Sequence, residues 1–205
     1  MKEFINRHWW SEKLKQRLPG VRAQQDMAPT FRGSFKEDGR PKMAAVMALL
    51  YPYREEGFLV FIKRNLYDGP HSGQVSFPGG AWEEEDQDLQ QTALRETREE
   101  LGIEADIRVL GALTPLHIPV SNFLVHPFLG WCEERPVFQP DASEVQYLIE
   151  VALSELTNPQ ICHSERIHHH GQWIHTPYYR VGKEKIWGAT AMMLSEILRL
   201  AARPQ

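Results

Sequence analysis

The sequence predicts an α/β protein in which a mixed β-sheet is covered by helices. Short runs rich in Ala, Val, Leu and Phe predict strands. A charged stretch over residues 87–101 predicts a helix that is apolar along one edge. Strand candidates lie both before and after this helix, as expected for a sheet with helices packed on its faces. The 205 residues are enough for one substantial domain but few for two.

We predict that residues 39–205 form this domain and that residues 1–38 hold an N-terminal docking helix and an extended lead-in. Apolar residues recur at rough helical spacing over residues 3–18, and a homodimer contact is the alternative use of this helix. Residues 21–42 are polar and predicted to be extended, whereas residues 65–80 are predicted to be turns. The other predicted elements are strands over 43–51, 58–63, 107–113, 123–132, 145–151, 161–168 and 173–179, and a helix over 190–201.

Composition excludes several classes of protein. A net charge of -4 argues against general nucleic-acid binding, which needs a basic face, but it permits an anionic small-molecule substrate. The two cysteines, Cys132 and Cys162, are too few for a disulfide framework and fit a reducing compartment. No apolar run resembles a signal peptide or a membrane span. The expected location is therefore cytoplasmic, with no membrane partner.

The helix at residues 87–101 brings acidic side chains together. At about 100° per residue, Glu96, Glu99 and Glu100 fall within an arc of about 100°. Leu94 and Leu101 lie on the neighbouring arc, which can pack against the sheet. Like charges at this spacing repel one another, so something is expected to offset the repulsion. A solvated acidic face balanced by the arginines of the helix is the alternative.

Two further features favour a metal site over a solvated face. Gly79 and Gly80 precede the helix, where backbone without side chains can approach a ligand or present a carbonyl oxygen. Clustered carboxylates are hard oxygen donors, and Mg²⁺ prefers a few of them together with water and substrate phosphates.

Residues 80–103 resemble the Nudix box, G-x5-E-x7-R-E-U-x-E-E-x-G-U, in which U is an aliphatic residue. The positions that match are Arg95, Glu96, Glu99, Glu100, Gly102 and Ile103. Thr97 stands at the first U position. Fourteen residues separate Gly80 from Arg95 where the general pattern has thirteen, and Asp86 serves the first acidic position. The same extension with Asp resembles the coenzyme A pyrophosphatase branch of the Nudix hydrolases.

A second motif is similar to the same branch, whose signature is approximately LLTxR-S-x3-R-x3-G-x3-FPGG. Residues 60–80 read VFIKRNLYDGPHSGQVSFPGG. The positions that match are Arg64, Gly73 and Phe77–Gly80. Asn65 replaces the Ser, and Gly69 stands where the second Arg is expected, which weakens the substrate assignment more than the family assignment. Residues 113–128, LTPLHIPVSNFLVHPF, also resemble this branch.

The resemblance implies the Nudix fold, an α/β/α sandwich with a mixed β-sheet, and hydrolysis of a diphosphate linkage with Mg²⁺ or Mn²⁺. The implied substrate is coenzyme A or an acyl-coenzyme A, cleaved to adenosine 3',5'-bisphosphate and 4'-phosphopantetheine. The implied metal ligands are Glu96, Glu99, Glu100 and the carbonyl of Gly80. The predicted catalytic residues are Glu99, Arg95 and Glu144: the base is a box glutamate or Glu144, and Arg95 pairs with a helix carboxylate.

Substrate contacts are expected from two further regions. Lys63 and Arg64 end a strand beside the glycine-rich loop, where basic side chains can hold phosphates. Ser121 and Asn122 lie in a proline-bounded loop, and a simple turn is the alternative for both. The run His168–His170 is interpreted as a polar strand end, because neighbouring residues of a strand point to opposite faces and do not converge on a metal.

Three alternatives remain open at this stage. In the first, the chain hydrolyses another Nudix substrate, such as ADP-ribose, a dinucleotide or a modified nucleoside triphosphate. In the second, the chain is a non-catalytic Nudix-like binding module, and the complete set of carboxylates argues against this. The third alternative is a structural protein with an acidic helix, and the two overlapping motifs argue against it.

Overall fold

The computed structural model of the protein describes residues 2–30, 39–69, 71–169 and 172–202. Most of the described strands join one eight-stranded mixed sheet, and the others form a three-stranded sheet. The large sheet contains β1 (Lys42–Tyr53), β2 (Glu56–Arg64), β3 (Val75–Ser76), β4 (Gly79–Ala81), β5 (Arg108–Ala112), β6 (Leu116–Ile118), β7 (Phe123–Trp131) and β8 (Val145–Ala152). The small sheet contains β9 (Cys162–His169), β10 (Gln172–Val181) and β11 (Glu184–Trp187).

Strand β1 is the centre of the large sheet. It pairs in parallel with β7 along its whole central part, from Lys42 opposite Phe123 to Leu50 opposite Trp131. On its other edge it pairs antiparallel with β2 at one end and with β4 at the other. The sheet is therefore mixed, as predicted, and it places the glycine-rich strand β4 directly beside β1.

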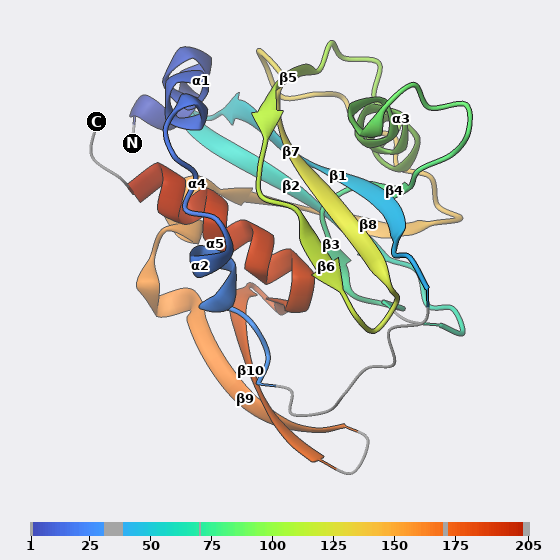
Figure 1. Cartoon of the computed structure of the whole chain (residues 1–205). Helices are drawn as coiled ribbons and strands as arrows, with labels where there is room; N and C mark the ends of the chain where they lie inside the picture. The colour runs from blue at the N-terminus through green and yellow to red at the C-terminus, as the bar shows by residue number, and fades with distance from the viewer. Residues whose placement is uncertain (1, 31–38, 70, 170–171, 203–205) are drawn as a thin grey trace.

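The helices lie on both sides of the large sheet. Of the described helices, only α3 covers one side, whereas α1, α2 and α5 lie on the other, and the β9–β10 hairpin extends away from the body (Figure 1). The helical elements are η1 (Lys2–Ile5), α1 (Arg7–Lys15), α2 (Val21–Gln25), α3 (Leu89–Leu101), α4 (Leu153–Leu156), η2 (Pro159–Ile161) and α5 (Gly188–Ala202).

Two hydrophobic cores form on the two faces of the sheet because side chains alternate along each strand. From β1, Met47 and Leu49 enter the core beneath α3. Ala48 and Leu50 enter the opposite core, which contains Trp10 of α1 and the inward side of α5. All these side chains are fully buried. This layering is the predicted α/β/α arrangement.

Two local predictions were wrong, and two short strands were missed. Residues 21–42 were expected to be extended, yet they begin with α2, which buries Ala23 and Gln24. The amide of Gln24 donates to the carbonyl of Thr114 at 2.8 Å and to Glu196 at 3.2 Å, so tertiary contacts hold this short helix. The region 65–80, expected to be turns, contains the short strands β3 and β4. Strands β6 and β11 were not predicted.

None of the helices in the described part of the chain combines the length and the apolar character needed to cross a bilayer.

Candidate active site

Helix α3 is fixed at both ends and along one edge. Asp88 caps its N-terminus by accepting a hydrogen bond from the amide of Gln91 at 2.8 Å. Gly102 ends the helix in the left-handed conformation, with φ of 58°. Leu94 and Leu101 are buried against the sheet. The three glutamates of the predicted metal site are therefore held on a rigid element beside the buried edge, as the sequence predicted.

Glu100 is the most buried of the three glutamates, with its side chain only 1% exposed. One of its carboxylate oxygens accepts a hydrogen bond from the amide of Gly79 at 2.8 Å, and the other lies 3.3 Å from Nη1 of Arg64. Burial nevertheless dominates and raises the pKa of Glu100 to about 7, while the Gly79 amide and Arg64 oppose the rise. These two contacts of Glu100 join α3 to Arg64, near the start of the motif over residues 60–80, and to Gly79, near its end.

A pH dependence of stability follows from Glu100. The pKa of Glu100 in the folded protein lies above its ordinary value of 4.5. Its contribution to the free energy of unfolding is therefore fully present below pH 4.5 and is lost as pH rises through about 7. In metal-free protein, the free energy of unfolding of Glu100→Gln relative to that of wild type should therefore rise as pH increases from 5 to 8. Each tenfold difference in proton affinity is worth about 1.4 kcal/mol, so we expect a relative gain of up to about 3 kcal/mol. Urea unfolding with EDTA at both pH values measures it, and an equal difference at both would contradict it.

Arg95 connects the other two glutamates to the loop before the helix. Its Nη1 lies 2.8 Å from Glu96 and 3.1 Å from Glu99. Its Nε and Nη2 donate to the two oxygens of Asp86 at 3.0 and 2.9 Å, which is a bidentate pair. The hydrogen bonds from Arg95 hold the pKa of Asp86 well below its usual range, whereas burial raises the pKa of Glu96. Asp86 also accepts from Thr92, so it orders the entry to α3.

The turn at Gly79 and Gly80 brings bare backbone against the carboxylates. Gly80 pairs with Ala45 of β1, and a Cβ atom on Gly80 would lie 2.4 Å from Cδ of Glu96. Any larger residue would have to displace that carboxylate. The sequence predicted that the glycines allow another group to approach the backbone closely. At Gly80 that group is the Glu96 side chain.

The donor chemistry at this position fits a hard divalent cation. Carboxylate oxygens from Glu96, Glu99 and Glu100 lie on one side of α3, and the backbone of Gly80 lies against Glu96. In the described part of the chain, however, no three acidic, His or Cys side chains form a ready metal cluster. The guanidinium of Arg95 instead pairs with Glu96 and Glu99.

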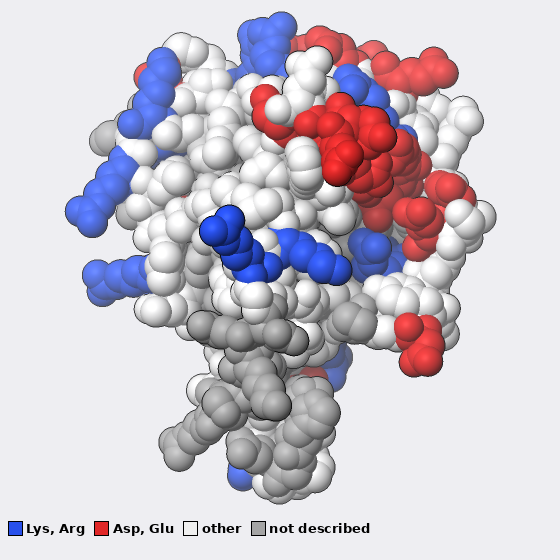
Figure 2. Space-filling model, turned by 45° about the vertical axis from the view of Figure 1, so that its right-hand side comes forward, with Lys and Arg blue, Asp and Glu red and all other residues white. Residues whose placement is uncertain are grey.

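Negative charge dominates the surface around α3. Glu83, Glu84 and Glu85 in the preceding loop are exposed, as is Glu99. In the space-filling view, acidic side chains gather in this region, with basic side chains beside them (Figure 2). An anionic substrate reaching α3 therefore needs positive charge near the carboxylates, and Arg64 supplies part of it.

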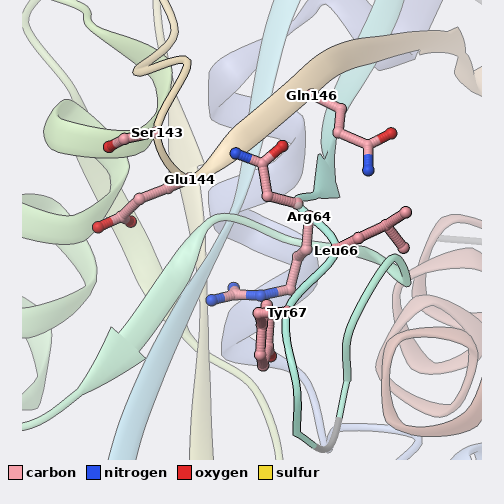
Figure 3. A pocket seen from close by; sticks show the side chains of 7 residues that line it. Arg64, Leu66, Tyr67, Ser143, Glu144 and Gln146 are labelled. Atoms are coloured by element: carbon pink, nitrogen blue, oxygen red, sulfur yellow. The ribbon is translucent and has the colours of Figure 1, made fainter.

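Two cavities meet at Arg64 and Tyr67, which line both of them. The first, here called the polar cavity, has a volume of about 510 Å³ and is shown in Figure 3. Its remaining lining residues are Asn65, Leu66, Ser143, Glu144 and Gln146. The second, here called the apolar cavity, has a volume of about 400 Å³ and reaches from Gly79 and Gly80 to α5.

Nonpolar side chains line much of the apolar cavity. They come from β1, β4, β6, β7 and α5, and from Phe77 shortly before the glycine turn: Ala44, Val46, Phe77, Ala81, Ile118, Phe123, Val125, Ala189 and Met193. Polar side chains from the loop after β2, from β3, from the loop before β7 and from α5 also line it. Among them His71 lies 3.2 Å through Nε2 from the hydroxyl of Ser121 and 3.3 Å through Nδ1 from Gln74.

The structure brings several of the predicted site residues to these cavities. Glu144 lines the polar cavity, and its side chain points toward α3 (Figure 3). Its charge contributes to the raised pKa of both Glu96 and Glu100, as expected for a neighbouring carboxylate. Ser121 lines the apolar cavity, and Arg64 lines both.

Other predicted residues lie elsewhere. Lys63 forms an ion pair with Glu184 of β11 at 2.7 Å. Asn122 has φ of 52°, accepts a hydrogen bond from the amide of Lys42 and contacts His117 at 3.1 Å, as a turn residue would. The described residues that line the two cavities include neither Lys63 nor Asn122. His168 is exposed on β9, and His170 lies outside the described residues.

Sequence reasoning missed Tyr67, His71 and Gln146 as lining residues. Tyr67 and His71 fall between Arg64 and the FPGG sequence, inside the motif but at positions that its pattern leaves unspecified. Gln146 is on β8, which pairs with β2 beside Arg64. Only the pairing of these two strands places it at the cavity, and no sequence signal specified that pairing.

The fold and the carboxylate helix together define a class of diphosphate hydrolase, and sequence comparison assigns the family. The profile of the NUDIX domain matches residues 41–175, and the chain belongs to the NUDIX family. It is 34% identical over 167 residues to the mitochondrial coenzyme A diphosphatase NUDT8 of Homo sapiens, covering 80% of this chain and 71% of that protein. It is 32% identical over 200 residues to the Nudix hydrolase NudL of Yersinia pestis, covering 96% and 92% of the two chains.

Solved structures support the fold. A Nudix hydrolase of M. smegmatis, RenU, superposes with a TM-score of 0.52 at 13% identity, covering 80% of this chain and 89% of that one. A MutT/nudix family protein of Enterococcus faecalis gives a TM-score of 0.50 at 15% identity, with 84% and 66% covered. The fold, the family and the hydrolase class expected from the sequence are therefore confirmed.

Proposed function

We propose that this NUDIX hydrolase cleaves the diphosphate of coenzyme A or of an acyl-coenzyme A, with Mg²⁺ or Mn²⁺ as the metal. Water adds across the phosphorus–oxygen–phosphorus linkage, and the products are adenosine 3',5'-bisphosphate and 4'-phosphopantetheine or its acyl form. The name of the human relative, a coenzyme A diphosphatase, supports this choice.

The apolar cavity is the observation that carries the substrate assignment. It begins at Arg64 and the glycine turn and continues among hydrocarbon side chains such as Phe123, Val125 and Met193. A pantetheine arm presents mostly methylene and methyl groups and fits such a lining. A second ribose presents hydroxyls rather than hydrocarbon, so it would gain less than a pantetheine arm from burial against Phe123, Val125 and Met193. Coenzyme A is therefore favoured over ADP-ribose and dinucleotides.

The residues of the site divide the work in the proposed reaction. Glu96, Glu99 and Glu100 hold the divalent ion, with the carbonyl of Gly80 as a further ligand. When bound, the ion supplies charge neutralisation for the diphosphate and a water of lowered pKa. Arg95 would remain in place through its bidentate pair with Asp86 if Glu96 and Glu99 turned to hold the ion.

Arg64 contacts the diphosphate in this proposal, because it lies between the two cavities and beside Glu100. Glu144, which points toward α3 from the polar cavity, is the proposed general base, and Glu99 is the alternative (Figure 3). Ser121 remains a proposed substrate contact. The ion pair of Lys63 with Glu184 argues against a direct substrate role for Lys63.

A substrate comparison tests the proposal. The kcat/KM for coenzyme A should exceed that for 3'-dephospho-coenzyme A by about tenfold to a hundredfold, which is the value of one charged hydrogen bond to the 3'-phosphate. It should also exceed kcat/KM for ADP-ribose and NADH. A higher kcat/KM for ADP-ribose or NADH than for every coenzyme A ester would contradict the substrate assignment and leave the NUDIX chemistry intact.

Metal linkage provides a second test. A ligand that binds only the folded state stabilises it by about 2.7 kcal/mol at a hundred times its dissociation constant. Mg²⁺ or Mn²⁺ should therefore raise the Tm of wild type, and the rise should shrink in the Glu96→Gln, Glu100→Gln double variant. Exposed Glu104 and Glu134 supply the matched control, in which both are changed to Gln and the rise should persist. Equal rises in all three proteins would mean that the ions bind elsewhere.

A further inference from the structure

The polar cavity and the apolar cavity differ in chemistry and meet at one place. Asn65, Ser143 and Gln146 bring amide and hydroxyl groups to the polar cavity, whereas the buried nonpolar side chains Phe77, Val125 and Met193 line the apolar cavity. Among the residues that the structure describes, Arg64 and Tyr67 alone line both cavities. Coenzyme A has the same division, with a charged nucleotide half and a largely hydrocarbon half that are joined through a diphosphate.

We propose that the two cavities hold the two halves of the substrate separately. The polar cavity, beside β8, takes the 3'-phosphoadenosine half. The apolar cavity takes the pantetheine arm and any acyl group, which extends toward α5. The diphosphate lies across Arg64, next to the carboxylates. This inference rests on the function proposed above and assigns specificity residues to it.

Tyr67 is the proposed stacking surface for the adenine. Its side chain is 46% exposed and lies beside Arg64 at the cavity (Figure 3). Its amide donates to the hydroxyl of Ser72 at 2.9 Å, which fixes the loop. A Cβ atom on Gly69 would lie 3.1 Å from Cε2 of Tyr67, so the glycine leaves room for the ring. A half-exposed ring at the edge of a polar cavity suits a nucleobase, since every base offers a flat face for stacking.

The floor of the apolar cavity sets the limit for the acyl group. Met193 of α5 is 3% exposed, and Val125 and Phe77 are also buried, so they close the deep end. Ala189, one turn earlier on α5, is only partly buried and lies nearer the surface. A large residue at position 189 would obstruct the cavity without entering the core, whereas a small residue at position 193 would deepen it.

Calorimetric binding of the two reaction products to the Mg²⁺-loaded full chain tests this division. Gln146→Trp should weaken binding of adenosine 3',5'-bisphosphate at least tenfold and change that of 4'-phosphopantetheine less than twofold. Ala189→Trp should show the opposite pattern. The matched controls are Gln160→Trp and Ala202→Trp, at exposed positions away from both cavities, and they should bind both ligands as wild type does. Met193→Ala should raise kcat/KM for longer acyl chains relative to free coenzyme A.

The outcomes separate the two proposals. If wild type fails to hydrolyse coenzyme A, the proposed function falls and this inference falls with it. If wild type hydrolyses coenzyme A but each tryptophan variant weakens both products equally, or the pattern is reversed, the function stands and the division of the cavities is wrong. Circular dichroism and thermal melting of each variant show whether it is folded, and a folded Ala189→Trp protein with wild-type affinity for both products also overturns the inference.

Discussion

Replacing Glu99 by glutamine should lower turnover by about a hundredfold or more while leaving the fold intact. Glu99 is a proposed metal ligand, and losing even an indirect contact to a bound metal typically costs about 10–100-fold. Its side chain is 58% exposed, and one of its oxygens lies 3.1 Å from Nη1 of Arg95. The amide oxygen of glutamine can still accept a hydrogen bond from that guanidinium. The free energy of unfolding should therefore change by less than about 0.5 kcal/mol. Steady-state kinetics with Mg²⁺ and urea unfolding without metal measure the two effects.

The control for this prediction is Glu104→Gln. Glu104 is an exposed acid shortly after α3, so its replacement removes the same charge and should leave turnover near the wild-type value. Glu96→Gln should behave like Glu99→Gln in turnover. Turnover near that of wild type in purified Glu96→Gln and Glu99→Gln proteins would remove the metal site from α3.

The sequence was sufficient to predict the parts of the fold that depend on local pattern. Helix α3 was predictable because Asp88 and Gly102 mark its ends and the buried leucines recur at helical spacing. The long strands β1 and β2 were predictable because runs of apolar residues are typical of strands buried on both faces. The pairing of Arg95 with Glu99 was predictable from their spacing on the helix.

Elements held by distant contacts were not predictable. Helix α2 has only five residues, too few for stable helix in isolation, and Gln24 holds it through Thr114 and Glu196. The buried contact between Arg64 and Glu100 joins a strand end to a helix 36 residues later, and no spacing rule specifies it. The two cavities likewise depend on strand pairing and on the packing of α5, so their chemistry became visible only in three dimensions.

The second large effect is expected on stability, from Gly79→Ala. Gly79 has φ of 150°, where side chains are rarely tolerated, and its Cβ would lie 2.3 Å from the carbonyl oxygen of Ala45 and 2.6 Å from Cα of Val46. Both are backbone atoms of the central strand β1, so neither can move aside cheaply. Backbone strain costs about 1–3 kcal/mol and forced overlap about the same, so the free energy of unfolding should fall by about 2–5 kcal/mol.

Gly182→Ala measures the cost of a positive φ where no overlap arises. Gly182 also has a left-handed φ, 54°, but its Cβ would meet no atom within 4 Å. Its replacement should therefore cost only about 1 kcal/mol, the penalty of the conformation alone. Turnover should also fall in Gly79→Ala, because the amide of Gly79 that donates to Glu100 would shift, and remain unchanged in Gly182→Ala. Equal losses of stability for Gly79→Ala and Gly182→Ala in urea unfolding would show that β4 can move away from β1. Close packing of the glycine turn would then not be what positions Glu100.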